Sequence, residues 1–552
     1  MTKGSSLMRL AKRLCFMVLM SSLTFAQTST SNDAASTSNV ADQLKKLQDG
    51  MAEQQKQITQ QQQQILKQQQ EMEALRQQLG TKQDVSAKAG DLSARMIDAS
   101  LHNTTTGNPT VQPASDAPAQ EDQTKESPLS FKIGGAQFTP GGFMDFTSIF
   151  RSTNTGNSGG TNFFSIPFNN QVQGHLTENR FTAQNSRVNL KATEKFGKND
   201  VTGFVEMDFL GNDAANVFVT SNSHTMRLRH YFLDLKRDKW EFLGGQVWSW
   251  LNPNRNGVSP YSADVFFSQN VDFNYQVGLT WTRAPQFRAV YHPNDNWALG
   301  IALENPEQFV GVGEVIFPFT LNAALGVQFD AGNNAGTPNV HPDLIPKIAY
   351  DTDIDGKHFH VEAAGLVTTI KAFNPITNQT NSATGGGGLL AANLELFKNF
   401  RLLGHVFHSD GGGRYIFGSG PDAVIRPDGT VSLVHASSGI AGFEAQVTPK
   451  TMFYGYYGGD YFQRNAFIDT TNPVPGRFAG FGGTNSPNSA NRTIQEGTLG
   501  WTQTFWKNPQ YGAVQLMTQY SYLTRSPWFV ALGAPKNAHL SMAWVNLRYT
   551  LP

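Results

Sequence analysis

From about residue 129 onward, apolar and polar side chains alternate in segments of roughly ten residues. In one such segment Val205 and Met207 alternate with Glu206 and Asp208. A period of two is typical of a β-strand that has one apolar face. Roughly ten residues is also the length that a tilted strand needs to cross a bilayer. The same alternation recurs in the segments 299–304, 514–522 and 545–551.

Two kinds of connection separate these predicted strands. Short polar turns lie near 196–199, 236–239, 293–296, 353–356, 398–399, 449–450 and 507–510. Long loops rich in Gly, Asn, Pro and Ser lie near 151–180, 211–224, 249–275, 305–345, 371–386, 409–438, 463–494 and 525–538. Seven turns and eight loops connect sixteen strands, with both chain ends on the side of the turns. The pattern predicts an all-β fold, a 16-stranded antiparallel transmembrane β-barrel, since a soluble β-sandwich would not segregate loop lengths in this way.

A Gln-rich segment before the barrel carries a seven-residue repeat. The apolar a and d positions are Leu44, Leu47, Met51, Ile58, Ile65, Met72, Leu75 and Leu79. This spacing predicts that the barrel is preceded by an N-terminal α-helical coiled coil over residues 40–80. Gln at the central d positions weakens the seam and does not fix the number of helices. The alternative is a disordered glutamine tract, which composition alone allows.

The N-terminal residues 1–26 have the three parts of a secretory signal peptide: a basic start, an apolar middle and small residues before the cleavage site. The only cysteine, Cys15, lies in this segment, so the mature chain has no thiol. A polar segment (27–39) precedes the coiled coil, and a low-complexity linker (81–128) leads to the barrel at 129–552. We expect the barrel in the cell outer membrane and the coiled coil in the periplasm.

Composition excludes several other classes of protein. Lys+Arg and Asp+Glu are 43 each, so the chain lacks the basic excess of a nucleic-acid-binding protein. The mean hydropathy is −0.36, and no apolar run is long enough for a membrane-spanning helix. The glycine runs at 385–388 and 411–413 lack the Gly-Lys-Ser/Thr of a phosphate loop, so we interpret them as flexible loops. No arrangement of catalytic residues is visible, and we expect neither an enzyme nor a cofactor.

The alternation also assigns charges to the lumen. Five cations have lumen parity, on the second, fourth and sixth predicted strands: Arg187, Lys191, Arg227, Arg229 and Arg288. The acids with the same parity are Glu206, Asp208, Glu304, Glu362, Glu395, Glu444 and Glu496. One reading is a basic wall that faces acids on other strands or on an infolded loop and selects anions. The other reading is solvated cross-strand ion pairs with no selective role.

Two histidine pairs come close to a metal-binding pattern. His358 and His360 share a strand face, and His405 lies near His408. With no third ligand in view, we interpret all four as lumen-lining residues and predict no metal site.

Six short stretches of sequence resemble the DcaP-like outer-membrane porins, which are related in plan to the phosphate-selective porins. They are 185–190, 203–209, 228–231, 244–249, 284–288 and 303–306, and beyond about 180–306 the resemblance is one of pattern only. It implies a homotrimer, a loop folded into each pore, and passive uptake of small anionic solutes such as dicarboxylates. The alternative function is a structural tether from the outer membrane to the cell wall through the coiled coil. The sequence does not identify the infolded loop.

Overall fold

The computed structural model describes residues 127–552 apart from residues 158, 212–223, 267–268 and 333–337. The predicted signal peptide and coiled coil, and all but the last two residues of the predicted linker, lie outside the described residues. Within the described part, no helix is both long and apolar enough to cross a membrane.

One antiparallel sheet contains 18 hydrogen-bonded strands, which occupy sixteen positions around a barrel. The short β1 (Phe131–Ile133) only extends the start of β2, and β3 and β4 pair with successive parts of β2. In chain order the positions are β2 (Ala136–Arg151), β3 with β4 (Glu178–Thr182, Arg187–Phe196), β5 (Asn199–Asp208), β6 (Arg227–Arg237), β7 (Trp240–Trp248), β8 (Arg283–Asn294), β9 (Trp297–Glu304), β10 (Asp343–Ile354), β11 (Lys357–Asn374), β12 (Gln379–Phe397), β13 (Phe400–Asp410), β16 (His435–Thr448), β17 (Thr451–Phe462), β20 (Asn491–Asn508), β21 (Gly512–Pro527) and β22 (Ala538–Thr550). The predicted strand count of sixteen is therefore confirmed.

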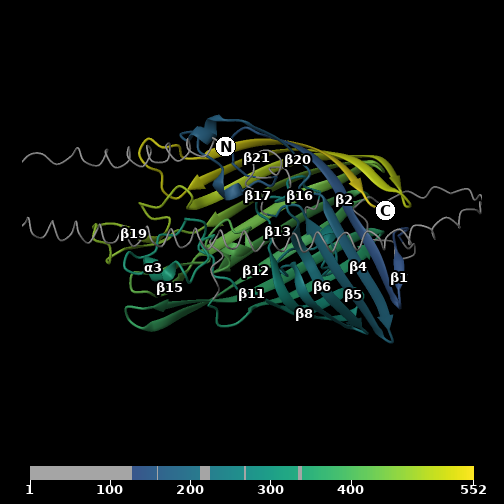
Figure 1. The fold of residues 1–552 in the computed structure, drawn as a ribbon, viewed down its shortest axis with the longest axis horizontal. Coiled ribbons are helices and arrows are strands. Elements are labelled where there is room, and N and C mark those ends of the chain that lie inside the picture. Colours follow the sequence, from purple (N-terminus) through teal and green to yellow (C-terminus); the bar gives the residue numbers. More distant parts are fainter. Residues whose placement is uncertain (1–126, 158, 212–223, 267–268, 333–337) are drawn as a thin grey trace, which may run out of the picture. The chain divides into compact units, whose positions relative to one another are not determined.

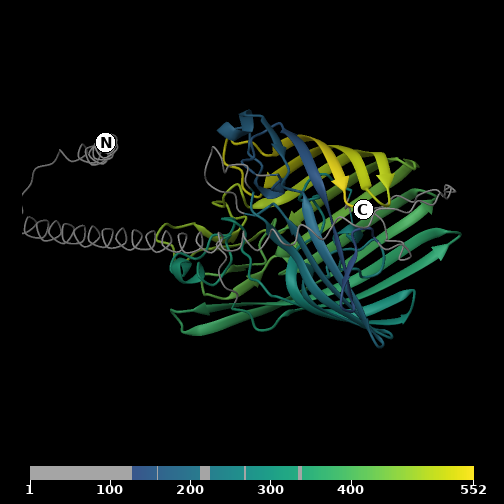
Figure 2. The same ribbon diagram turned by 45° about the vertical axis from the view of Figure 1, so that its right-hand side comes forward.

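The first and last strands close the barrel. β22 pairs with β2 from Phe143↔Thr550 to Arg151↔Met542, and the two strands lie side by side in Figure 2. Closure matters because a lipid bilayer offers no hydrogen-bond partner to the backbone of an open sheet edge. Every strand of the ring consequently has a neighbour on both sides.

The short turns and the long loops lie at opposite ends of the barrel. Figure 1 shows β1 and the C-terminus at one end, and α3, β15 and β19 at the other. The long loops carry two small hairpins, β14 (Ala423–Ile425) with β15 (Val431–Leu433) and β18 (Asn465–Ile468) with β19 (Phe478–Phe481). They also carry the short helices α3 (Asn322–Leu325), η2 (Phe163–Ser165), η3 (Val172–His175), η4 (Ser262–Asp264) and η5 (Gly413–Tyr415). The predicted segregation of loop lengths is confirmed except between β11 and β12, where only residues 375–378 separate the two strands.

Side-chain exposure follows the predicted alternation on β5. Val205 is exposed on the outer surface, whereas its neighbours Phe204 and Glu206 are buried on the lumen side. An apolar outer face is what a membrane strand presents to lipid, and its alternate positions then carry the polar residues. The same contrast separates exposed Phe287 from buried Arg288 on β8.

One predicted loop is wrong. Residues 371–386 are mostly strand, because β11 runs to Asn374 and β12 starts at Gln379, with only 375–378 between them. The glycine run 385–388 lies within β12 and pairs with both neighbouring strands rather than forming a flexible loop. A Cβ on Gly385 would lie 2.1 Å from the carbonyl oxygen of Asp410, so glycine here permits close strand contact.

Removing residues 27–128 is expected to leave a folded barrel, because every strand of the closed sheet starts after this segment. Folded barrels of this kind run differently on gels before and after boiling. The truncated chain should keep that heat-modifiable migration. Loss of it would contradict the domain boundary at 128.

Candidate functional site: the lumen loop and its charges

Residues 249–282, between β7 and β8, form a loop whose described part, all but 267–268, crosses the inside of the barrel; we call it the lumen loop. It is held by side chains or backbone of strands far from β7, namely β10, β12, β13, β16, β20 and β21. Its apolar residues Leu251, Phe266 and Leu279 are fully buried. The loop therefore packs as part of the interior and narrows the space that the strands enclose.

A buried ion pair anchors the tip of the lumen loop. The guanidinium of Arg255 donates to both carboxylate oxygens of Glu444 on β16, at 2.7 Å for the Nη1–Oε2 contact. Tyr456 donates to the same carboxylate at 2.8 Å, and Asn393 donates to the Arg255 carbonyl at 2.7 Å. Because both charges are buried and paired in two contacts, the geometry of the loop tip is strongly specified.

On the side of β10, two further contacts hold the start of the loop. The ammonium of Lys347 lies 3.1 Å from the carbonyl oxygen of Asn252 and 3.0 Å from Glu362. The backbone N–H of Gly257 donates to Asp351 at 3.1 Å. These polar groups of β10 and β11 are therefore used to hold the loop.

On the opposite wall the backbone of the loop contacts β16, β17, β20 and β21. The N–H of Val277 donates to Glu496 at 3.0 Å, and that of Val271 donates to Gln519 at 2.6 Å. Gly278 has a φ of +93°, and a Cβ there would lie 2.3 Å from the carbonyl oxygen of Gly439. Only glycine lets the loop approach the barrel wall this closely.

Two of the five predicted lumen cations form cross-strand ion pairs with acids of β5. Arg227 donates to both oxygens of Asp208, at 3.0 and 2.7 Å. Arg229 lies 2.8 Å from Glu206 and 2.7 Å from Asp208, and its side chain is only 3% exposed. At these residues the structure shows the cross-strand pairs of the second reading, with Arg229 and both acids buried and the side chain of Arg227 38% exposed.

The other cations of the same wall meet aromatic side chains. Arg187 lies 3.5 Å from the hydroxyl of Tyr275 in the lumen loop and over the ring of Phe143. Lys191 lies over the ring of Tyr261, 5.6 Å from its centroid. Both cations are partly exposed toward the lumen.

The phenol of Tyr275 lies beside the guanidinium group of Arg187. Burial raises the pKa of its phenol, but the guanidinium groups of Arg187 and Arg229 outweigh burial, and the net pKa lies below its usual value. The two guanidinium groups therefore favour the ionised form of this phenol.

Arg288 does not line open space. Its guanidinium donates to Gln286 at 2.6 Å and to the carbonyl of Trp248, and it lies over the ring of Trp250. The lumen loop covers it, because Trp250 belongs to that loop. Glu304 is also fully buried, and accepts the N–H of Trp250 at 2.7 Å.

Four aromatic residues beside the cations were missed in the sequence. Trp248, Tyr275, Trp281 and Phe417 form a chain of ring contacts, with centroids 4.6 Å apart for the stacked Trp281 and Phe417. Arg283 lies over the ring of Trp248. These residues come from a strand end and two loops, where no two-residue period applies, so the alternation gave no signal for them.

The predicted lumen histidines divide between the two faces. His360 is buried inside, 2.8 Å from Asp351 and 3.3 Å from Glu362, and His358 contacts Asp351 at 3.3 Å. His405 is also buried inside and accepts the N–H of Thr280 at 3.2 Å. His408, three residues later, is exposed on the outer face, so its interpretation as a lumen-lining residue is wrong.

The remaining predicted acid, Glu395, lies at the turn end of β12. It accepts the backbone N–H of Asn399 at 3.0 Å and that of His358 at 3.3 Å. Its contacts are thus with the turn and the neighbouring strand.

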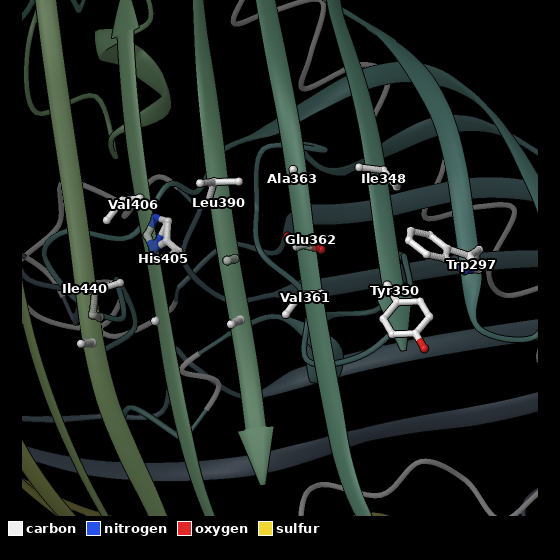
Figure 3. Close-up of a pocket in the computed structure, with 14 residues that line it drawn as sticks. Trp297, Ile348, Tyr350, Val361, Glu362, Ala363, Leu390, His405, Val406 and Ile440 are labelled. Carbon is white, nitrogen blue, oxygen red and sulfur yellow. The ribbon is translucent and has the colours of Figure 1, made fainter. Parts of the chain in front are cut away.

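The barrel also has an apolar hollow of about 630 Å³ across β9 to β16 (Figure 3). Exposed outer-face residues such as Val361, Leu390 and Val406 line it, together with small residues such as Ala363 and Gly404. Buried Glu362 and His405 belong to the other side of the same strands. The hollow is therefore a thin part of the wall on its lipid side, and is separate from the lumen charges.

No protein-family model and no curated protein matches the chain. Among solved structures, the chain is similar to the outer membrane channel DcaP of Acinetobacter baumannii, with a TM-score of 0.55 and 17% identity over 77% of this chain and 100% of that one. It is more distantly similar to the anion-selective porin of Comamonas acidovorans, with a TM-score of 0.43 and 12% identity over 75% and 100% of the two chains. The resemblance to DcaP extends to the fold, and residues 127–552 have the fold of a porin-like outer-membrane channel.

Proposed function

We propose that this protein is an outer-membrane porin that admits small polar anions, such as dicarboxylates, by passive diffusion. Barrels of about sixteen strands are wide enough to leave an aqueous channel. The observation that carries the proposal is the lumen loop, which is pinned across the barrel and leaves partly exposed Arg187 and Lys191 beside it. A channel with a fixed constriction and a charged rim discriminates solutes by size and sign.

The preference for anions rests on the wall formed by β4 and β6. Arg227 and Arg229 are balanced by Asp208 and Glu206, so they contribute little net charge to the lumen. Arg187 donates to the phenol of Tyr275 and lies over the ring of Phe143, and among the described residues no carboxylate forms an ion pair with it. The depressed pKa of Tyr275 supports a positive potential at this position.

The first test releases the lumen loop. In Glu444→Gln the buried guanidinium of Arg255 loses its charged partner, which destabilises such a site by about 3–5 kcal/mol. We expect larger and noisier single-channel conductance in planar bilayers, together with a lower unfolding temperature.

Glu395→Gln is the matched control, because this carboxylate contacts the turn of β12 and the neighbouring strand. It should leave conductance unchanged. Equal conductance in Glu444→Gln and the native protein would mean that the loop does not form the constriction.

The second test removes the two partly exposed cations in Arg187→Gln/Lys191→Gln. The reversal potential in a salt gradient should move toward cations and uptake of dicarboxylates should slow. The Debye length is about 10 Å at 0.1 M salt and about 3 Å at 1 M, so the change should shrink in high salt.

Arg237→Gln is the control for charge alone, because Arg237 is exposed beside Asp238 at a short turn, away from the lumen loop. A shift as large in this control, or none in the double variant, would contradict a selective role for Arg187 and Lys191.

We also propose a homotrimer, as the family resemblance implies. Native mass measurement in mild detergent should give three copies of the full chain. The chain lacking residues 27–128 should stay trimeric, because contacts between the barrels do not depend on the coiled coil. In the full chain these contacts hold the weak Gln-containing helices close together and so favour their association. A monomeric full-length protein would contradict this assembly.

A further inference from the structure

Three potential metal ligands converge on the outer surface of the barrel, where β13 ends and β16 begins. His408 and Asp410 come from β13, and His435 is the first residue of β16. Antiparallel pairing sets Asp410 directly opposite His435 and His408 opposite Ser437. One ligand atom from each of the three residues lies within 4.8 Å of the other two. Sheet register, and not a mobile loop, therefore holds the cluster together.

The cluster is separate from the lumen. Asp410 and His435 have side chains that are 44% and 50% exposed, whereas the alternate residues Phe407 and Ser409 are buried on the lumen side. Asp410 and His435 flank the loop of residues 411–434, whose ends are joined by the N–H of Gly411 donating to Val434 at 3.1 Å. An ion bound at the cluster would connect the two ends of this loop without narrowing the channel.

The side chains are already arranged as a ligand set. Nδ1 of His435 bonds the carboxylate of Asp410, and the rings of His408 and His435 stack with their planes 10° apart. Nδ1 of His408 lies 2.7 Å from the hydroxyl of Ser437, a contact that orients the ring. Ligand atoms of a tetrahedral ion bound at about 2.1 Å lie about 3.4 Å apart, so small side-chain rotations close this set around an ion.

We propose that His408, Asp410 and His435 bind a divalent transition-metal ion of the zinc class. Two imidazoles and one carboxylate suit Zn²⁺, Ni²⁺ or Cu²⁺ rather than Mg²⁺ or Ca²⁺, which prefer oxygen ligands. The ion keeps at least one position for water, because the cluster lies at the loop end of the barrel, where β13 ends and β16 begins, and the side chains of Asp410 and His435 are about half exposed. Because the ion binds the folded barrel and not the unfolded chain, the free energy of unfolding rises with the logarithm of the free metal concentration.

The test uses the full-length, untagged protein in detergent, titrated with Zn²⁺ and followed by calorimetry and thermal unfolding. We expect one ion per chain and an unfolding temperature that rises with Zn²⁺ and falls back with a chelator. Both effects should be lost in His408→Gln/His435→Gln and in Asp410→Asn. These groups are exposed, so heat-modifiable migration should show that the variants still fold.

His539→Gln is the matched control. His539 is an exposed histidine on β22 whose Nδ1 contacts the hydroxyl of Tyr522 at 3.1 Å, and within the described residues it belongs to no ligand cluster. Loaded with Cu²⁺, the native protein and this control should give an electron paramagnetic resonance spectrum with two nitrogen ligands. No Zn²⁺ binding, or binding that survives in both cluster variants, would overturn the proposal and leave an ordinary histidine–aspartate ion pair.

Discussion

Pairing of β2 with β22 is the constraint on which the rest of the structure depends. A closed ring satisfies the strand backbones without water, and it divides every strand into a lipid face and a lumen face. That division decides where a charge is tolerated: Arg288 lies inside while its neighbour Phe287 faces lipid. The lumen loop, the ion pairs and the outer-surface histidines all take their positions from this ring.

Inside the ring, the lumen loop fills space that the strands alone would leave open. Charges such as Glu444 and Lys347 are buried because the lumen loop covers them, and they are stable there because the same loop supplies Arg255 and the Asn252 carbonyl. Loop and wall are therefore mutually dependent. Removing one partner would leave the other as a buried charge without its counter-charge, which is destabilising.

Much of this fold could be predicted from the sequence, because a two-residue period and a contrast in loop length are local signals. They identified sixteen strands and the lumen face of Arg187 and Glu206. They did not reveal that 249–282 crosses the lumen, since its contacts with Glu444 and Glu496 join residues about two hundred positions apart. Local patterns carry no information on such pairings. At 371–386 the local pattern itself was misleading. Glycines, which are typical of loops, here allow close contact between neighbouring strands.

The difference between local pattern and long-range contact also determines which lumen charges are paired and which are not. Strand parity treats Arg187, Arg229 and Arg288 alike, yet the first meets Tyr275, the second is neutralised by two acids and the third is covered by the lumen loop. Counting cations on lumen positions therefore overestimates the field that a solute meets. The number of cations on lumen-facing positions indicates selectivity only after the lumen loop has been located and each charge has been matched to its partner. Of these three arginines, Arg187 donates to a phenol, whereas Arg229 pairs with two carboxylates and Arg288 donates to an amide and a backbone carbonyl.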